Sequence, residues 1–199
     1  VAASPATLSF TPQNWSIPQT VTVTGVDDSL LDGAQTTAVM LTPQTGTGEG
    51  GGPAREVDVV TIDDDTAGFI IQETGGATVV SENGTTDTFT LVLTAEPSGA
   101  VVFQIVCEDA TEAGAAPETV VFEPGDWDAP RTITVTGVDD DEADGSQTVA
   151  VTVSVIDDAL QDDFDDQSQT VSVAIADNDH RIATAPVTGV SLPPSPRAG

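Results

Sequence analysis

Two stretches of this chain repeat the same sequence at a constant spacing of 112 residues. Residues 8–36 read LSFTPQNWSIPQTVTVTGVDDSLLDGAQT, and residues 120–148 read VVFEPGDWDAPRTITVTGVDDDEADGSQT, with 16 of these 29 positions identical. A chain that repeats itself in this way is built from copies of one structural unit. A spacing of this length matches the size of a compact domain with its own core. The repeat therefore predicts tandem units of one fold.

The sequence between the turns has the pattern of β-strands. Nearly every ordered segment alternates apolar and polar residues and is rich in β-branched side chains. In the second copy we expect strands at 68–73, 77–81, 87–95, 100–107, 118–123, 131–138, 147–156 and 168–176. Short strands with frequent turns predict an all-β fold, with immunoglobulin-like antiparallel β-sandwich repeats in tandem.

The two copies are unequal in extent. Residues 66–179, here called the complete unit, hold all of the expected strands. Residues 1–65, here called the half-unit, hold counterparts of the last four only, at 6–10, 19–26, 35–41 and 56–62. Half a sandwich exposes its core face and its strand edges. We therefore expect either that the chain was cut from a longer tandem protein or that a partner supplies the missing strands. Residues 180–199 match the start of a further unit, or a donor strand, followed by a Pro-rich linker.

Composition limits the possible partners. The chain has 33 acidic residues, four Lys or Arg and one His, for a net charge of −29. Nucleic acids and anionic membranes bind basic surfaces, and membrane insertion needs a long apolar segment, so none of these partners is expected. With so few basic side chains and no nucleophile motif, the sequence predicts that the protein is not an enzyme.

Acidic residues recur in the turns of both copies. Counting strands through the complete unit places four segments at one end of the sandwich: the turn 81–84, the loop 108–114, the turn 139–146 and the exit 177–179. The half-unit repeats the last two of these segments, with Asp27, Asp28 and Asp32 in the turn and Asp63, Asp64 and Asp65 at the exit.

So much negative charge at one end requires compensation. Two like charges 4 Å apart repel by about 4 kcal/mol at an effective dielectric of ~20. Ca²⁺ accepts many oxygen ligands in flexible geometry, whereas Mg²⁺ demands a strict octahedron and zinc prefers His or Cys. Solvated turns in a generally acidic protein are the alternative, but recurrence at one register in both copies favours a metal. The acidic run 157–166 has no counterpart in the half-unit and is expected to be a solvated loop.

The turn DD-x-x-x-D-G, followed some thirty residues later by a strand ending in DDD or DND, resembles the Calx-beta domain. This family occurs in sodium–calcium exchangers, integrin β4 and large bacterial surface proteins. The longer pattern FTPxNW…PxTVTVTGVDD resembles bacterial tandem arrays of that type. The resemblance covers residues 1–179 and implies a seven-stranded immunoglobulin-like sandwich with a Ca²⁺ cluster at one pole.

The resemblance also implies a set of calcium ligands. In the complete unit these are Glu82, Glu112, Asp139, Asp140, Asp144, Asp177, Asn178 and Asp179. Gln147 and Asn178 stand where the family often has acids, so the unit is expected to hold fewer or weaker ions. In the half-unit the matching residues are Asp27, Asp28, Asp32, Asp63, Asp64 and Asp65. The early segments are missing there, so that site is incomplete unless another chain contributes.

These observations predict a calcium-binding structural module of a secreted or cell-surface repetitive protein. Ca²⁺ at the exit 63–65 would make the joint between neighbouring units rigid, and the partners would be neighbouring repeats or identical subunits. One alternative is a filament subunit completed by strands of its neighbour. Another is an adhesin for a cell-surface glycan or protein, with Trp15 and Trp127 as stacking platforms. Their matched positions before a proline favour core caps instead.

Overall fold

The computed structural model describes residues 1–44, 51–156 and 163–179, which form strands, loops and one short 3-10 turn. The expectations for the tail 180–199 and for residues 157–162 lie outside the described residues. Among the described residues, no helix is long and apolar enough to cross a membrane.

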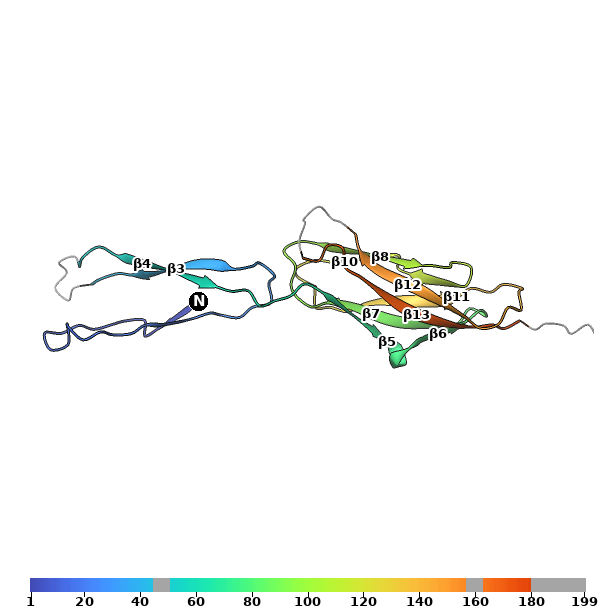
Figure 1. The fold of residues 1–199 in the computed structure, drawn as a ribbon, viewed down its shortest axis with the longest axis horizontal. Coiled ribbons are helices and arrows are strands. Elements are labelled where there is room, and N and C mark those ends of the chain that lie inside the picture. The colour runs from blue at the N-terminus through green and yellow to red at the C-terminus, as the bar shows by residue number, and fades with distance from the viewer. Residues whose placement is uncertain (45–50, 157–162, 180–199) are drawn as a thin grey trace, which may run out of the picture.

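The complete unit is a sandwich of two sheets packed face to face (Figure 1). The first sheet has the order β5 (Phe69–Glu73), β7 (Thr86–Leu93), β11 (Arg131–Gly137) and β9 (Ala113–Ala116). The second has the order β10 (Thr119–Phe122), β8 (Val101–Cys107), β12 (Gln147–Val155), β13 (Ser168–Ala176) and β6 (Thr78–Ser81). All pairs are antiparallel except β6 with β13. The 3-10 turn η1 (Thr74–Gly76) joins β5 to β6. The predicted immunoglobulin-like β-sandwich is confirmed.

Alternating side chains from both sheets fill the core. Phe103 lies at its centre, with its ring edge-on to Phe69 at 4.9 Å and to Phe122 at 5.9 Å between ring centroids. Trp127 packs against this core, as expected of a cap, but the same prediction is wrong for Trp15, which is 72 % exposed. Phe164 is also buried in it, so the prediction of a solvated loop at 157–166 is wrong for this residue. Phe164 is flanked by Asp on both sides, so the sequence pattern around it predicts an exposed loop and gives no sign that its ring is buried.

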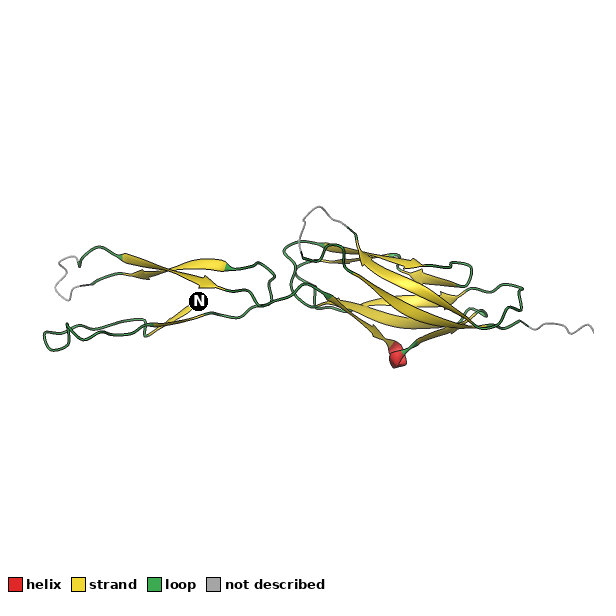
Figure 2. Ribbon diagram, viewed as in Figure 1, coloured by secondary structure: helices red, strands yellow, loops and turns green. Residues whose placement is uncertain are grey.

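The half-unit consists of two separate hairpins rather than a sandwich (Figure 2). One pairs β1 (Ala2–Ser4) with β2 (Thr22–Thr24), and the other pairs β3 (Gln35–Leu41) with β4 (Arg55–Thr61). In the complete unit β10 pairs with β8, but nothing in the half-unit corresponds to β8. Residues 6–10 therefore have no partner strand among the described residues, and the strand predicted there is wrong.

Strand β9 was missed by the sequence analysis, which placed residues 108–114 in a loop. It pairs with the end of β11, and its counterpart 112 residues earlier is β1. The sequences AGAAP at 113–117 and VAASP at 1–5 are similar at the same spacing, so the repeat begins earlier than residues 8 and 120. Strands β9 and β1 consist of small residues without β-branched or aromatic side chains, so the sequence pattern did not predict them. The complete unit accordingly has nine described strands, not the eight expected from the pattern or the seven implied by the resemblance.

The half-unit joins the complete unit through the turn that follows β2. The Leu31 N–H donates to the Glu96 carbonyl at 3.0 Å, and the Glu96 N–H donates to the Ser29 carbonyl at 2.7 Å. Leu30 forms an isolated parallel bridge with Glu96, and Leu31 packs against the core of the complete unit. The turn that carries half of the repeated acids is therefore also the contact between the two parts of the chain.

Candidate metal centre

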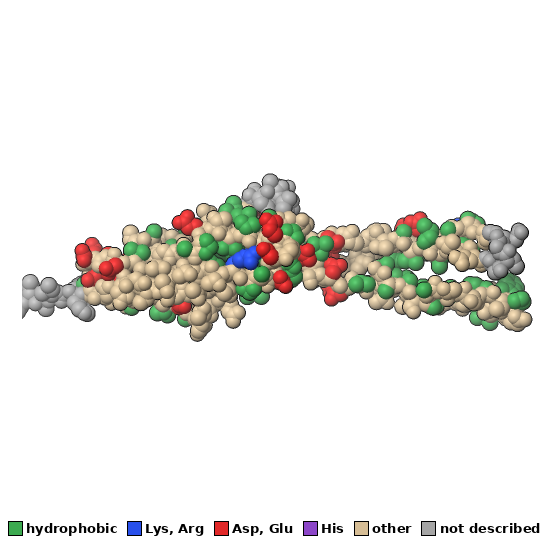
Figure 3. Space-filling model, turned by 180° about the vertical axis from the view of Figure 1, so that it is seen from behind, with side chains coloured by type: hydrophobic (Ala, Val, Ile, Leu, Met, Phe, Trp, Pro, Cys, Tyr) green, Lys and Arg blue, Asp and Glu red, His purple; other side chains and the backbone are tan. Residues whose placement is uncertain are grey.

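Four segments of the complete unit meet at the end of the sandwich away from the half-unit. Glu82 follows β6, and Glu112 precedes β9. The turn between β11 and β12 contributes Asp139, Asp140 and Asp144. The chain leaves β13 through a last group of three residues, Asp177, Asn178 and Asp179. Figure 3 shows acidic side chains gathered at this end and again at the joint with the half-unit.

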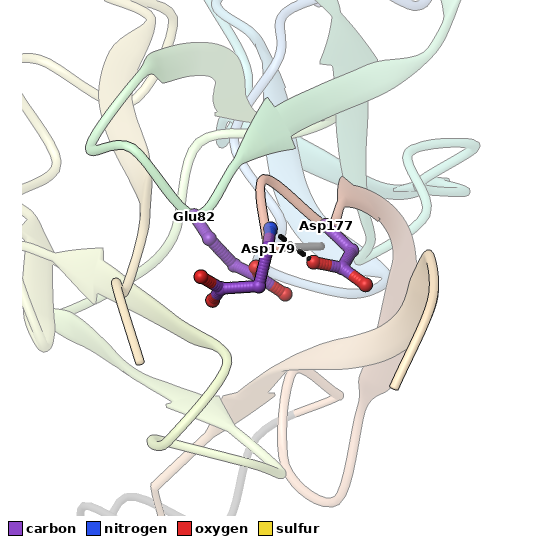
Figure 4. Close-up of side chains that lie close together, drawn as sticks. All are labelled: Glu82, Asp177 and Asp179. Atoms are coloured by element: carbon purple, nitrogen blue, oxygen red, sulfur yellow. Dashed lines mark hydrogen bonds between the residues drawn. The ribbon is translucent and has the colours of Figure 1, made fainter. Parts of the chain in front are cut away.

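Three carboxylates form the centre of this group. Glu82, Asp177 and Asp179 each offer an oxygen atom, and these atoms all lie within 4.8 Å of one another. Figure 4 shows the three side chains converging from the end of β6 and the exit of β13. Glu82 is only 1 % exposed although its side chain is ionisable, whereas isolated buried carboxylates are rare because desolvation is costly. Among the described residues no other group of His, Cys, Asp and Glu has this geometry.

Backbone hydrogen bonds hold the centre in place. Asp177 accepts from the Gly145 N–H at 2.7 Å and from the Asp179 N–H at 2.6 Å. The Asn178 N–H donates to Glu82 Oε2 at 3.1 Å, and the Asn178 side-chain amide donates to Asp139 Oδ1 at 2.9 Å. The exit is thereby tied to the β6 end and to the β11–β12 turn. The Asn178 amide is engaged with a neighbouring acid.

Gly137, at the end of β11, is required by a close approach. A Cβ there would collide with the Ser81 carbonyl oxygen and the adjoining backbone. Without a side chain at this position, the end of β11 passes directly against the end of β6, which presents Glu82. Sequence reasoning did not single out Gly137, although it recurs as Gly25 within the repeated TVTVTGVDD.

The electrostatics of the centre reflect uncompensated negative charge. The hydrogen bond from Asn178 lowers the pKa of Glu82, but burial and the charges of Asp177, Asp140 and Asp144 outweigh it and leave that pKa raised. Burial, together with neighbouring Asp charges, also raises the pKa of Asp179. The pKa of Glu112 is also raised, with burial as the largest cause and the charge of Asp144 as the next. Burial and the neighbouring negative charges thus disfavour the ionised form of these three groups in the folded chain.

Two buried oxygens have no hydrogen-bond partner. These are Glu112 Oε2 and Asp179 Oδ2, the only two such side-chain atoms in the described parts of the chain. An orphaned carboxylate oxygen at a buried position needs a donor or a cation. Both unpartnered atoms belong to residues that the sequence analysis named as calcium ligands.

The remaining candidates of the complete unit lie at the edge of this centre. Asp139 and Asp144 are exposed and Asp140 is half-buried. Asp140 accepts a hydrogen bond from the Glu142 N–H at 2.8 Å, and Asp144 accepts from the Gln147 amide at 2.9 Å. Asp140 and Asp144 are close enough to raise the pKa values of Glu82 and Glu112, and Asp139 helps to raise the pKa of Asp179. None of these three acids is part of the three-carboxylate group.

The half-unit repeats the backbone arrangement without the buried carboxylates. Asp63 accepts from the Gly33 N–H at 2.7 Å and from the Asp65 N–H at 2.9 Å, as Asp177 does from Gly145 and Asp179. These bonds, with Asp65 as the largest cause, lower the pKa of Asp63, while burial and neighbouring acids raise that of Asp65. The acids Asp27, Asp28, Asp32, Asp63, Asp64 and Asp65 line one open hollow of about 430 Å³. Counterparts of Glu82 and Glu112 are missing from it.

A second hollow connects the half-unit to the complete unit. Its lining includes Asp63, Asp65 and Leu31 together with Asp163, which comes from the loop between β12 and β13. Sequence reasoning overlooked Asp163 as a contributor to the joint, because its loop has no counterpart in the repeat. It also overlooked Leu30 and Leu31, which stand where the complete unit has Glu142 and Ala143.

No protein-family model and no curated protein sequence matches this chain. Among solved structures, the E. coli chaperone DraB is 8 % identical with a TM-score of 0.43, and the match covers 57 % of each chain. The apo form of the Calx CBD1 domain is 15 % identical with a TM-score of 0.37, covering 56 % of this chain and 98 % of that one. The calcium-binding domain CBD12 of CALX1.1 is 16 % identical with a TM-score of 0.37, over 56 % and 45 % of the two chains. The matches to DraB and to the chaperone YadV span 57 % and 52 % of those chains. Likenesses this weak assign no function.

Proposed function

We propose that this chain is a calcium-binding structural module of a secreted or cell-surface repetitive protein, with no catalytic role. The observation that carries the proposal is the buried Glu82 carboxylate beside Asp177 and Asp179, with oxygen atoms within 4.8 Å of one another. Three carboxylates at this separation repel one another unless a cation lies among them. Oxygen-only ligands and flexible loops suit Ca²⁺ best.

The residues present fit such an ion. Glu82, Asp177 and Asp179 would hold it, and Glu112 and Asp179 each provide a buried oxygen that has no other partner. Asp140 and Asp144 lie near enough to add ligands or negative charge. When bound, Ca²⁺ would supply the positive charge that the centre lacks. The protein's own contribution is to fix Asp177 through the N–H groups of Gly145 and Asp179.

A weaker site at the joint is the second part of the proposal. The Asp63 exit leads directly into β5, and Asp163 of the complete unit lines the same hollow as Asp63 and Asp65. A cation there would hold the half-unit against the complete unit, in addition to the contact of Leu31 with the core. Extracellular calcium is abundant enough to fill sites with dissociation constants of about 10⁻⁴–10⁻³ M.

Calcium titration tests the proposal. We expect heat of binding by isothermal calorimetry, a higher melting temperature in Ca²⁺, and a narrower distribution of inter-unit distances by small-angle scattering. Mg²⁺ at the same concentration should have a smaller effect. The calcium-binding proposal is wrong if calcium produces neither heat nor a shift in melting temperature. A scattering curve unchanged by chelator would contradict the proposed role of calcium at the joint between the two units.

The pH dependence of stability should change sign with calcium. Without calcium, the raised pKa values of Glu82, Glu112 and Asp179 mean that the folded chain binds protons more tightly than the unfolded chain. Their contribution is complete below their ordinary pKa values and is lost as pH rises through the raised values. The melting temperature without calcium should therefore rise as pH falls through these raised pKa values toward the ordinary ones.

With saturating calcium the opposite slope is expected, because protons compete with the ion for the same carboxylates. Asp63, Asp109 and Asp126 have lowered pKa values and stay ionised in both states over this range, so they do not contribute. Differential scanning calorimetry at several pH values, with calcium and with chelator, measures both slopes. Slopes of equal sign would argue against metal binding by these carboxylates.

A further inference from the structure

The segment that enters the complete unit and the strand that leaves it lie side by side and run in the same direction. The chain enters at the joint, passes through β5, η1 and β6, and reaches Glu82 at the acidic pole, the end that also carries Asp177 and Asp179 (Figure 1). Strand β13 ends at the same pole and pairs with β6 in parallel, whereas all other strand pairs in the described residues are antiparallel. Entry and exit therefore lie at opposite ends of the sandwich.

Tension along the chain would load this parallel pair in shear. Residues 1–65 precede the complete unit and residues 180–199 follow it, so a pull on the chain acts on β6 through its first residue and on β13 through its last. The hydrogen bonds of a ladder run across the strands, so strands that are pulled past each other load all of these bonds at once. Strands that are pulled apart from one end break them one at a time. The parallel arrangement of β6 and β13 is therefore one that resists tension.

Side-chain amides fasten β13 to the entering segment near the joint. Gln169, at the start of β13, donates to the Phe69 carbonyl at 2.7 Å. Gln167, two residues earlier, donates to the Ala67 carbonyl at 3.2 Å. The bond from Gln169 crosses between the sheets, because β5 and β13 belong to different sheets of the sandwich. The beginning of β13 is thereby tied to the beginning of β5.

The same two segments are fastened again at the acidic pole. The Glu82 N–H donates to the Ala176 carbonyl at 3.2 Å, and the Asn178 N–H donates to Glu82 Oε2 at 3.1 Å. Between the two ends, the ladder aligns Thr78–Ser81 with residues 173–176 of β13. The entering segment is therefore bound to β13 at both ends and along the ladder between them.

We propose that the complete unit carries mechanical tension, with β6 and β13 as a clamp that must shear before the unit can unfold. Calcium would close this clamp, because Glu82 directly follows one strand while Asp177 and Asp179 follow the other. An ion among these three carboxylates would join the strands at the end where β13 is pulled. The role of calcium rests on the proposed function, whereas the clamp rests on the strand order and on the hydrogen bonds between its strands.

Pulling on single molecules tests the clamp. The full 199-residue chain is held by its two ends in optical tweezers, and the rate of unfolding at constant force is measured in chelator and in calcium. This rate is the relevant quantity, because forced unfolding is governed by the unfolding rate. Unfolding of residues 66–179 should lengthen the chain by roughly 350 Å, the extended length of these residues less that of the folded unit. The half-unit has too few residues to release this length, so the step identifies the complete unit.

Two valines in opposite edge strands of the second sheet provide a matched pair. Val80 of β6 and Val120 of β10 are 2 % and 5 % exposed, and each strand has four residues. Both Ala variants lose a similar buried contact and should lose similar thermal stability. Val80→Ala should unfold about tenfold faster under tension, because it loosens the clamp. Val120→Ala should unfold at nearly the rate of the unaltered chain, because β10 lies outside the clamp. Equal acceleration of both variants, or none in Val80→Ala, would overturn the proposal.

The clamp and the calcium function fail in different ways. At a calcium concentration 100 times the dissociation constant, unfolding under tension should slow by up to about 100-fold. If calorimetry shows calcium binding but the two valine variants unfold alike under tension, the clamp is wrong and the calcium-binding module remains. If Val80→Ala alone is accelerated in chelator, while calcium produces neither heat nor slower unfolding, the clamp is supported and the calcium function is lost.

Discussion

Replacing Gly137 with Ala should lower the melting temperature of the complete unit by roughly 10–15 °C. The added Cβ would collide with backbone atoms at the end of β6, with the Ser81 carbonyl oxygen nearest. Overpacking costs about 1–3 kcal/mol where side chains can move aside. Backbone atoms in paired strands cannot do so, which places the expected cost near ~3 kcal/mol. Thermal unfolding followed by circular dichroism measures this loss.

Calcium affinity should fall in the same variant, because Glu82 follows Ser81 directly and would be displaced with it. Gly25 is the matched control. A Cβ at Gly25 would meet only the Thr61 methyl group, at 3.3 Å, since β6 has no counterpart in the half-unit. Gly25→Ala should therefore change the melting temperature by only a few degrees. If Gly137→Ala were equally harmless, the close approach of β11 to β6 would be wrong, and with it the position of Glu82.

The sandwich could be predicted because strand signals are local. Alternation of apolar and polar residues identified β7, β8, β11, β12 and β13, and these long strands supply most of the core. Strand β9 was not predicted because Ala113–Ala116 contains only Ala and Gly and so shows no alternation of apolar and polar residues. Residues 6–10 have a strand pattern but remain outside any sheet, because pairing depends on a neighbour that the local pattern cannot report.

The candidate site could be predicted in outline but not in detail. The repeated turn and exit indicated which segments carry acids, and the structure brings Glu82, Asp177 and Asp179 together. Which carboxylates are buried depends on how the β6 end passes β11, a tertiary contact permitted by Gly137. The contacts at the joint were harder to predict. Leu31 lies in a segment that differs between the copies, and Asp163 lies in a loop that has no counterpart in the half-unit.

Replacing Glu82 with Gln should have opposite effects with and without calcium. In the calcium-free chain, Gln removes a buried negative charge beside Asp177 and keeps an oxygen that can accept from the Asn178 N–H. The melting temperature without calcium should therefore hold or rise. With calcium, loss of a direct ligand should cost about 100-fold or more in affinity, since even outer-shell changes cost about 10–100-fold. At a calcium concentration 100 times the dissociation constant of the unaltered chain, bound calcium adds about 2.7 kcal/mol to its free energy of unfolding, and the variant should lose most of this.

Glu118→Gln provides the control, because Glu118 is exposed, lies outside the acidic pole and changes the net charge by the same amount. It should leave both melting temperatures and the calcium heat almost unchanged. A purely structural role for Glu82 would make the Gln variant less stable under both conditions, and a surface-charge effect would appear equally in Glu118→Gln. Only a buried ligand explains a variant that is at least as stable in chelator, less stable in calcium and distinct from its control. Scanning calorimetry of the three proteins in calcium and in chelator separates these outcomes.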